Sequence, residues 1–456
     1  MLKTLRSSHR LCRVYHGSKN ALKMQKRLFL SDAYRCEEAW DRRLKSPLLQ
    51  KIEPSTMFVE LEQKYGNVGK VSAVDVDIFI NSITDDAYLD QIMKMLHNLR
   101  TSTEATNILD STHHAAIRYF LRYDYIEELH EMLSDRLNYG IFPDYFDYNM
   151  LMDHFIKKKN YASAAKIASL VMLQEELAHP ITNALCLYAC HKYLENPDDW
   201  KKPEVPVDTS KEEKKIRVKY IRNPFFDDHF DLTNPRDLVG KTLSFQGKHR
   251  TDAVGRTCQL RGLILYKRYD DVLNLIKNWL ETMHREDNIV YEEVFELISK
   301  DNSELQEPNI EKFKLVEAQL SALKKQQNLK ESLIEAMENL VKVAVKEEAE
   351  KDISKQCQNY LDWDRVRNSV LEIQIKAIDR ERRIANIDRI KKDLKEREQL
   401  LTFFNKEEEI ELEIEKIQEK ERREDERIHA MRRSKQKLRA LITTESYVPP
   451  DVKTTK

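Results

Sequence analysis

Glycine and proline are scarce in this sequence, with 8 glycines and 12 prolines in 456 residues. Nucleotide-binding α/β enzymes need glycine-rich loops to cradle phosphates, so this composition disfavours that class. The motifs GxxxxGK[ST], HExxH and GxSxG are missing. No run of 18 apolar residues occurs, as a membrane-spanning helix would require. These absences predict a non-enzymatic, all-α protein with no cofactor, no small-molecule substrate and no membrane partner.

Cysteine is also sparse: the six cysteines are scattered and form no CxxC pair. This usage is typical of a reducing compartment without a disulfide framework. Cys186, Cys190 and His191 fall on one predicted helix, but a tetrahedral zinc site would need further converging ligands. We therefore interpret the two thiols as buried apolar side chains and predict no metal site.

Acidic residues are missing from the first 31 residues, which carry eight Lys and Arg against a net charge of −1 for the whole chain. The remainder therefore has a net charge of −9. An Arg-rich, Ser-containing, acid-free start predicts a mitochondrial transit peptide over residues 1–31 and hence a matrix location. A basic tail that binds nucleic acid is the alternative. Because the remainder is acidic, any RNA contact must come from local basic faces.

What the chain does contain is a recurring helical hairpin, most legible between residues 139 and 175. Gly140 and Pro143 mark a turn, and two helical stripes follow, separated by a short lysine-rich turn. Tyr88, Tyr125 and Tyr161 each begin a predicted second helix, at spacings of 37 and 36 residues. Such hairpins cannot bury their own cores, so the period predicts a short stack of four to six units.

The remaining chain divides by composition. An irregular lead-in occupies residues 32–70, with one short helical stretch at 33–44, and the repeat domain occupies 71–300. A proline-containing, basic insertion at 197–250 interrupts the repeats. Residues 301–446 form a long helical, coiled-coil-like extension because neither Gly nor Pro occurs between Pro308 and Pro449. Residues 447–456 are predicted to be a disordered tail.

The extension changes character along its length. Its first part is amphipathic, and residues 360–363 suggest a turn or a packing point. Past Val370 the apolar face thins, and charge dominates from Glu407. Broken heptads argue against a parallel coiled-coil dimer, so we expect a solvated helix or one docked along a partner.

The hairpin YGIFPD…FDYNMLMDHFIKKKNY resembles the pentatricopeptide repeat, which ends in a Gly-x-x-Pro-Asp turn. Together with LSDAYRCEEAW, GLILYKRYDDVL and NYLDWDRV, it is also similar to the family of small-subunit protein twenty-seven of the mitochondrial ribosome. This resemblance implies a structural component of that subunit, in contact with rRNA and other ribosomal proteins and supporting mitochondrial translation. A free pentatricopeptide RNA-binding factor acting in transcript processing or translation is the alternative, and a coiled-coil scaffold without RNA is a third possibility.

Candidate RNA contacts are basic residues that can neutralise phosphates next to aromatic side chains, although most charge runs are solvated faces. Asn149 is added because it lies near the base-reading position of RNA-binding repeats; helix capping by Asn149 and Asp144 is the preferred interpretation. The predicted RNA-binding residues are Arg118, Arg122, Asn149, Lys157, Lys158, Lys159, Lys214, Lys215, Arg217, Lys219, Arg222, Arg432 and Arg433.

Overall fold

The computed structural model describes residues 29–200, 227, 229–282, 288–301, 309–402 and 406–444. Within these ranges the protein is all-α, which confirms the predicted fold class, and the only extended pairing there is one bridge between Tyr291 and Leu329. None of the described helices is long and apolar enough to cross a membrane. The helices are α1 Glu37–Asp41, α2 Pro54–Val68, α3 Ala73–Ser82, α4 Leu89–Thr101, α5 Asp110–Arg122, α6 Ile126–Ser134, α7 Tyr145–Lys157, α8 Tyr161–Leu173, α9 Pro180–Tyr193, α10 Pro235–Lys248, α11 Ala253–Leu265, α12 Tyr269–Thr282, α13 Glu293–Asp301, α14 Asn309–Lys324, α15 Leu333–Thr402 and α16 Glu407–Thr444.

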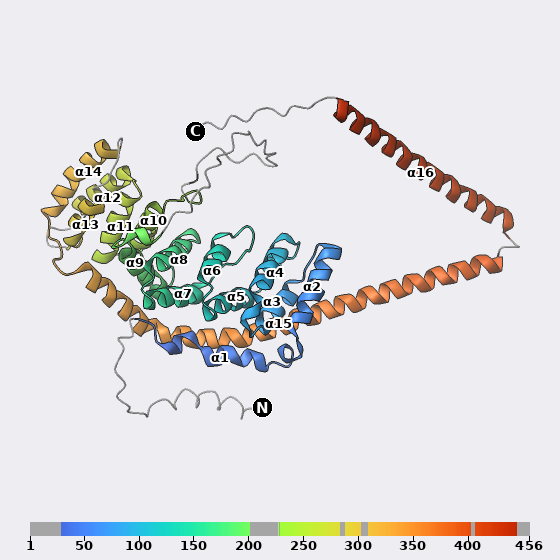
Figure 1. Ribbon diagram of the computed structural model, residues 1–456, viewed down its shortest axis with the longest axis horizontal. Helices are drawn as coiled ribbons and strands as arrows, with labels where there is room; N and C mark the ends of the chain where they lie inside the picture. Colours follow the sequence, from blue (N-terminus) through green and yellow to red (C-terminus); the bar gives the residue numbers. More distant parts are fainter. Residues whose placement is uncertain are drawn as a thin grey trace. The chain divides into compact units, whose positions relative to one another are not determined.

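Successive helices form antiparallel pairs, α3 with α4, α5 with α6 and α7 with α8, and the first helices of the pairs also pack on one another (Figure 1). The row α3, α5, α7, α9 is called the first-helix face below. Tyr88 and Tyr125 precede α4 and α6, and Tyr161 begins α8, as the tyrosine spacing predicts.

The same backbone turn joins three pairs of consecutive helices, α5–α6, α7–α8 and α11–α12. Asp124, Lys159 and Lys267 each adopt a left-handed conformation, with φ of 62°, 60° and 62°. This geometry is usually supplied by glycine at a helix C-terminus. The recurring bonds are Tyr125 N–H to Phe120 O at 3.0 Å, Asn160 N–H to Phe155 O at 2.9 Å and Arg268 N–H to Leu263 O at 3.0 Å.

Two expectations about irregular segments are wrong. The lead-in contains the 15-residue helix α2, because Pro54 stands at its first position and Gly69 ends it with φ 67°; both residues are helix boundaries rather than breakers. The predicted insertion contains α10, which packs on α8 and α9 and so completes a fourth pair. Residues 201–226 of that insertion lie outside the described residues, as do residues 1–28 of the predicted transit peptide and the tail at 447–456.

Four of the eight glycines line the contact between α10 and α11. A Cβ on Gly262 would lie 2.4 Å from Ser244 N and 2.5 Å from Gly240 O, and one on Gly247 would lie 2.6 Å from Gly255 O. The absence of side chains lets the two backbones approach closely.

The predicted long extension consists of α14, α15 and α16. Val316, Leu320 and Leu323 on α14 are buried, as are Met337 and Val341 on α15, which confirms the predicted amphipathic period. Residues 360–363 are a packing point and not a turn, because they lie inside α15, a single helix of 70 residues.

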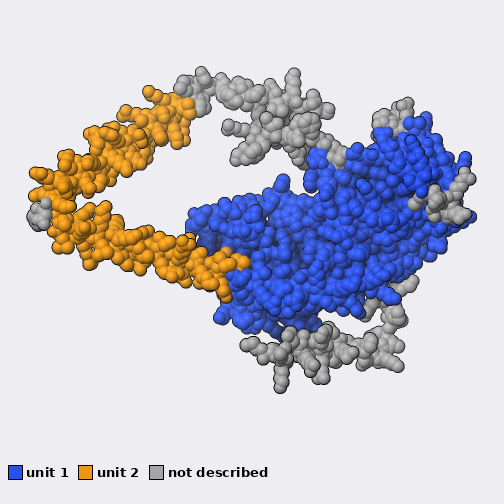
Figure 2. Space-filling view, turned by 180° about the vertical axis from the view of Figure 1, so that it is seen from behind, with its two compact units in different colours: residues 1–369 blue, residues 370–456 orange. Residues whose placement is uncertain are grey.

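Compact unit 1 spans residues 1–369 and unit 2 spans 370–456, so their boundary falls inside α15 (Figure 2). Unit 1 holds a large hydrophobic cluster reaching from Leu30 to Ala344. A second cluster joins α11–α14 around Val272, Ile276 and Val294. The described helices of unit 2 expose their apolar side chains, including Ile384, Ile387 and Leu394.

Candidate RNA-contact surfaces

The first-helix face is covered by two segments of the same chain. The first is residues 333–369 of α15 and the second is the N-terminal stretch 29–46; together they are called the strap. Figure 1 shows the first part of α15 alongside α3, α5 and α7. The strap reaches each helix through buried polar contacts, and these decide which side chains remain available to RNA.

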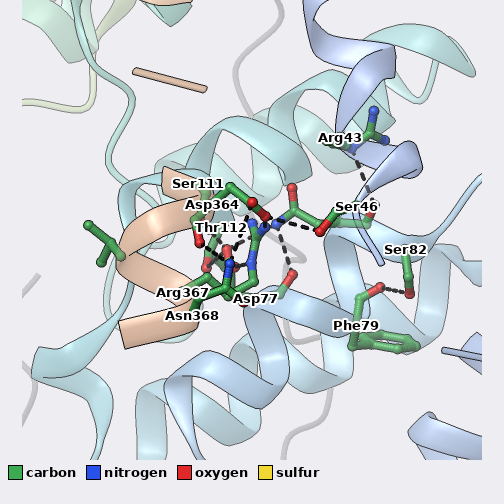
Figure 3. A network of polar contacts seen from close by, with 12 residues as sticks. Arg43, Ser46, Asp77, Phe79, Ser82, Ser111, Thr112, Asp364, Arg367 and Asn368 are labelled. Atoms are coloured by element: carbon green, nitrogen blue, oxygen red, sulfur yellow. Dashed lines mark hydrogen bonds and ion pairs between the residues drawn. The ribbon is translucent and has the colours of Figure 1, made fainter. Parts of the chain in front are cut away.

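At α3, Arg367 donates a hydrogen bond to Asp77, with Nε 2.6 Å from Oδ2 (Figure 3). Both side chains are almost fully buried, with Asp77 0% and Arg367 3% exposed. Thr112 Oγ1 donates to the second carboxylate oxygen at 2.9 Å, and Ser111 donates to it as well. This satisfied ion pair fixes α15 to α3 and α5.

At α5, His114 is the junction. Arg118 Nε donates to His114 Nε2 at 2.8 Å, so Nδ1 carries the proton and donates to Asp147 on α7 at 2.5 Å. Tyr360 of the strap lies 2.9 Å from the same Nε2. Burial, followed by the nearby Arg118 charge, lowers the pKa of His114 well below its usual value, and burial raises the pKa of Asp147 to about 7.

At α7, Asn149 is fully buried. Its amide donates to Tyr34 OH at 3.0 Å and its carbonyl accepts from Thr182 Oγ1 at 2.8 Å. Tyr34 donates in turn to Asp352 of α15 at 2.8 Å. Asn149 therefore joins neighbouring helices and the strap. Asp144, in contrast, caps α7 as predicted, by accepting from Asp147 N–H at 2.8 Å.

Two of the predicted RNA-binding residues, Asn149 and Arg118, are buried in this structure. Asn149 is interior, and Arg118 is only 7% exposed. Arg118 is bonded to the Arg35 carbonyl, to Tyr360 OH at 3.0 Å and to Glu37 at 3.2 Å. The sequence indicated that Arg118 lies on one face of a helix. That face is covered by α15, whose Tyr360 is 242 residues away in the sequence.

The three predicted lysines differ in their surroundings. Lys157 holds the start of the strap, with Nζ 2.9 Å from Leu30 O and 2.7 Å from Asp153. Lys158 is exposed and pairs with Asp124. Lys159 is exposed in its left-handed turn, and Arg122 is exposed at the end of α5. Arg122, Lys158 and Lys159 thus keep the accessibility that an RNA contact requires.

The other predicted residues fall in two places. Arg432 and Arg433 are exposed on α16. Lys214, Lys215, Arg217, Lys219 and Arg222 lie outside the described residues.

A further basic surface, which the sequence did not predict, is an open groove of about 560 Å³ between α10, α11 and α12. Lys241 and Arg268 both lie over the ring of Tyr266, at 5.6 and 5.4 Å from its centroid. Burial lowers the pKa of Lys241, although Asp227 and Glu175 oppose the shift. Lys248, Gln259 and Asn278 also line the groove. These residues come together only because α10 packs on α11. In the sequence, the basic and aromatic residues of KHR and YKRY were the pattern that could have indicated this surface.

Cys186 and Cys190 are fully buried within α9. Cys186 contacts the sulfur of Met152 at 3.7 Å, and His191 Nδ1 lies 3.1 Å from Arg261. These contacts are core packing and a buried polar bond, in line with the interpretation of the thiols as apolar side chains.

The paired helices and the buried strap define an all-α protein built of helical hairpins over the described residues. Residues 3–393 match the family model described as mitochondrial 28S ribosomal protein S27, and the chain belongs to that family. It is thus a protein of the small subunit of the mitochondrial ribosome.

Proposed function

We propose that this chain is a non-enzymatic architectural component of the small subunit, which binds rRNA through exposed basic surfaces and neighbouring proteins through its helical extension. The observation that carries this proposal is the covering of the first-helix face by the strap. His114 and Asn149 lie near the positions at which RNA-binding repeats read bases. Both side chains form hydrogen bonds within the protein. A chain of this kind grips RNA by shape and phosphate contact rather than by sequence.

The rRNA contact is assigned to the groove between α10, α11 and α12, to Arg122, Lys158 and Lys159, and to Arg432 and Arg433 of α16. The groove offers cations for phosphates and Tyr266 for stacking. The predicted basic residues of the insertion, Lys214, Lys215, Arg217, Lys219 and Arg222, belong to the same proposal.

The neighbouring proteins are assigned to unit 2. Ile373, Ile387 and Leu394 are 66%, 50% and 58% exposed on α15, a pattern that buries apolar area only when a partner helix covers it.

We also propose that the transit peptide is removed before Phe29. Leu30 is 2% exposed, and its N–H donates to Asp153 at 3.2 Å. Loss of Leu30 would leave that buried carboxylate with one partner fewer.

Sedimentation of a mitochondrial lysate through a sucrose gradient tests the main proposal. Comigration with the small subunit after a high-salt wash supports an integral component. Recovery only in light fractions would support instead a free RNA-binding factor acting on transcripts.

A charge-reversal set tests the groove. Lys248→Glu with Arg268→Glu should weaken binding of small-subunit rRNA to the full-length protein. The slope of log K against log salt should fall by about 0.7–0.9 for each phosphate that the variant no longer neutralises. The matched control reverses Lys64 and Lys94, surface lysines paired with Asp75 and Glu62. Equal weakening in both sets would remove the groove from the proposal.

A further inference from the structure

The two halves of the strap lie side by side and run in the same direction. Tyr34 OH donates to Asp352 at 2.8 Å, the rings of Trp40 and Tyr360 are 5.4 Å apart, and Ser46 Oγ donates to Asp364 at 3.2 Å. Residue numbers rise together along both segments. Cys36 therefore falls opposite the stretch of α15 between Asp352 and Tyr360.

Cys357 occupies that stretch, and it packs against the same hydrophobic cluster that contains Cys36. Cys36 is 7% exposed, has a left-handed φ of 51° at the start of α1 and donates its thiol proton to Tyr34 O at 3.4 Å. Cys357 is partly exposed. The accessible thiol of the pair is thus the one on α15.

The surroundings shift the pKa values of the two thiols in opposite directions. Interaction with the neighbouring Cys36 thiol, aided by the positive charge of Arg42, lowers the pKa of Cys357 to about 7 despite its partial burial. The same interaction, together with burial, raises the pKa of Cys36. Cys357 is the nucleophile and Cys36 the resolving thiol, an arrangement found in oxidant-sensitive cysteine pairs.

We propose that Cys36 and Cys357 form a reversible dithiol–disulfide site, oxidised by hydrogen peroxide, that joins the two halves of the strap covalently. The Cys357 thiolate attacks peroxide, so that an S–O bond forms, the O–O bond breaks and hydroxide leaves. The Cys36 thiol then attacks the sulfenic sulfur, the S–S bond forms and the S–O bond breaks. Its proton and the departing hydroxyl form water. Two thiols and one peroxide thus yield one disulfide and two waters, and a small thiol or dithiol reverses the change.

No other described cysteine offers this chemistry. Cys186, Cys190 and Cys258 are buried and lie in the helix core, and burial raises the pKa of each. They provide internal controls in the same molecule.

The test uses the full-length chain with Cys12→Ser, which removes the cysteine that lies outside the described residues. After treatment with peroxide, digestion without reductant and mass spectrometry, we expect one cross-linked peptide pair containing Cys36 and Cys357. Cys357→Ser should abolish it. Cys36→Ser should leave a sulfenic acid at Cys357 that dimedone traps, an outcome that purely structural thiols would not give.

A second readout follows from the long loop that the bond closes. Oxidation should raise Tm by at least about 4 °C, and reductant should reverse the rise. Cys258→Ser is the matched control and should keep both the cross-link and the reversible shift. Oxidation that spreads equally over all cysteines, or a Cys357 that proceeds to sulfinic acid with Cys36 still present, would overturn the proposal.

Discussion

Charged side chains inside unit 1 are held by partners from distant parts of the chain. Arg367 meets Asp77 at 2.6 Å and Arg261 meets Asp301 at 2.7 Å. A buried ion costs several kcal/mol to desolvate unless it is paired and hydrogen-bonded. These pairs therefore specify which segments may pack together, more than they add to net stability.

Removal of one partner should accordingly be costly. Arg367→Ala leaves Asp77 buried with only hydroxyl and amide donors, and we expect a loss of about 3–5 kcal/mol in the free energy of unfolding. Arg365→Ala is the matched control, because Arg365 is exposed and pairs with Asp362 at 2.8 Å; its loss should be about 0–1 kcal/mol. Chemical denaturation followed by circular dichroism measures both. Similar midpoints for the two variants would contradict the proposed importance of the buried pair.

The partly buried His130 makes stability depend on pH. Burial, with a smaller effect of Lys166, lowers the pKa of His130 to about 4, and the ring lies 2.9 Å from Ser163 Oγ and stacks on Phe155. Between the unfolded pKa near 6.5 and the folded value, the unfolded chain binds the extra proton, so this contribution to stability falls as pH falls.

The variant His130→Gln should therefore lose less unfolding free energy than the unmodified protein between about pH 7.5 and about pH 5. Thermal unfolding at both pH values supplies the comparison, and each protein at the higher pH is its own baseline. Parallel losses in the two proteins would show that another group controls this range. Asp144 and Asp147 titrate with the opposite sign, because burial raises their pKa values to about 7.

At the scale of elements, helix pairs are shaped by turns and by close backbone contact. The left-handed turns at Asp124, Lys159 and Lys267 give three pairs the same exit geometry. Between α10 and α11, glycines allow the two backbones to approach closely, and any side chain at these positions would push the helices apart.

Gly262→Ala should destabilise the protein by about 1–3 kcal/mol, because its methyl group would meet backbone atoms that cannot move aside. Gly66→Ala is the matched control in α2, where nothing lies within 4 Å of the new Cβ. That change should stabilise the protein by about 0.5–1 kcal/mol, since alanine is the better helix former. The denaturant midpoints of the two variants and of the unmodified protein measure both effects. Midpoints that shift in the same direction for both variants would contradict the argument from close backbone approach.

At the scale of the whole molecule, contacts of the strap join both ends of unit 1 to the repeat pairs, and we expect these parts to unfold as one cooperative unit. The chain enters the large hydrophobic cluster at Leu30 and returns to it at Leu333 and Ala344. Unit 2, by comparison, has no buried side chain among its described residues.

Truncation after Ser369 should thus leave the unfolding transition of unit 1 nearly unchanged. Truncation after Val345 removes Asp352, Tyr360 and Arg367 from the first-helix face. The shorter protein should unfold at lower temperature and bind the apolar dye ANS, because buried apolar area becomes exposed. Equal Tm values and equal dye binding would show that α15 is not part of the cooperative unit.

The sequence by itself determined the all-α class, the hairpin period, the turn tyrosines and the long breaker-free extension, because these depend on residues within a few helical turns of one another. It also contained the family resemblance. Local patterns failed where one residue type can occupy two kinds of structure. Pro54 and Gly69 lie at the two ends of α2 rather than in an irregular segment, and the glycines of α10 allow close helix packing rather than forming a loop.

Only the tertiary structure decided which basic residues are accessible. Arg118 and Arg122 are one turn apart on α5, yet the strap buries the first and leaves the second accessible. Burial is a property of contacts between segments remote in sequence, and no periodicity along α5 encodes the arrival of Tyr360. The same reason hid the groove at Tyr266 and the meeting of Cys36 with Cys357.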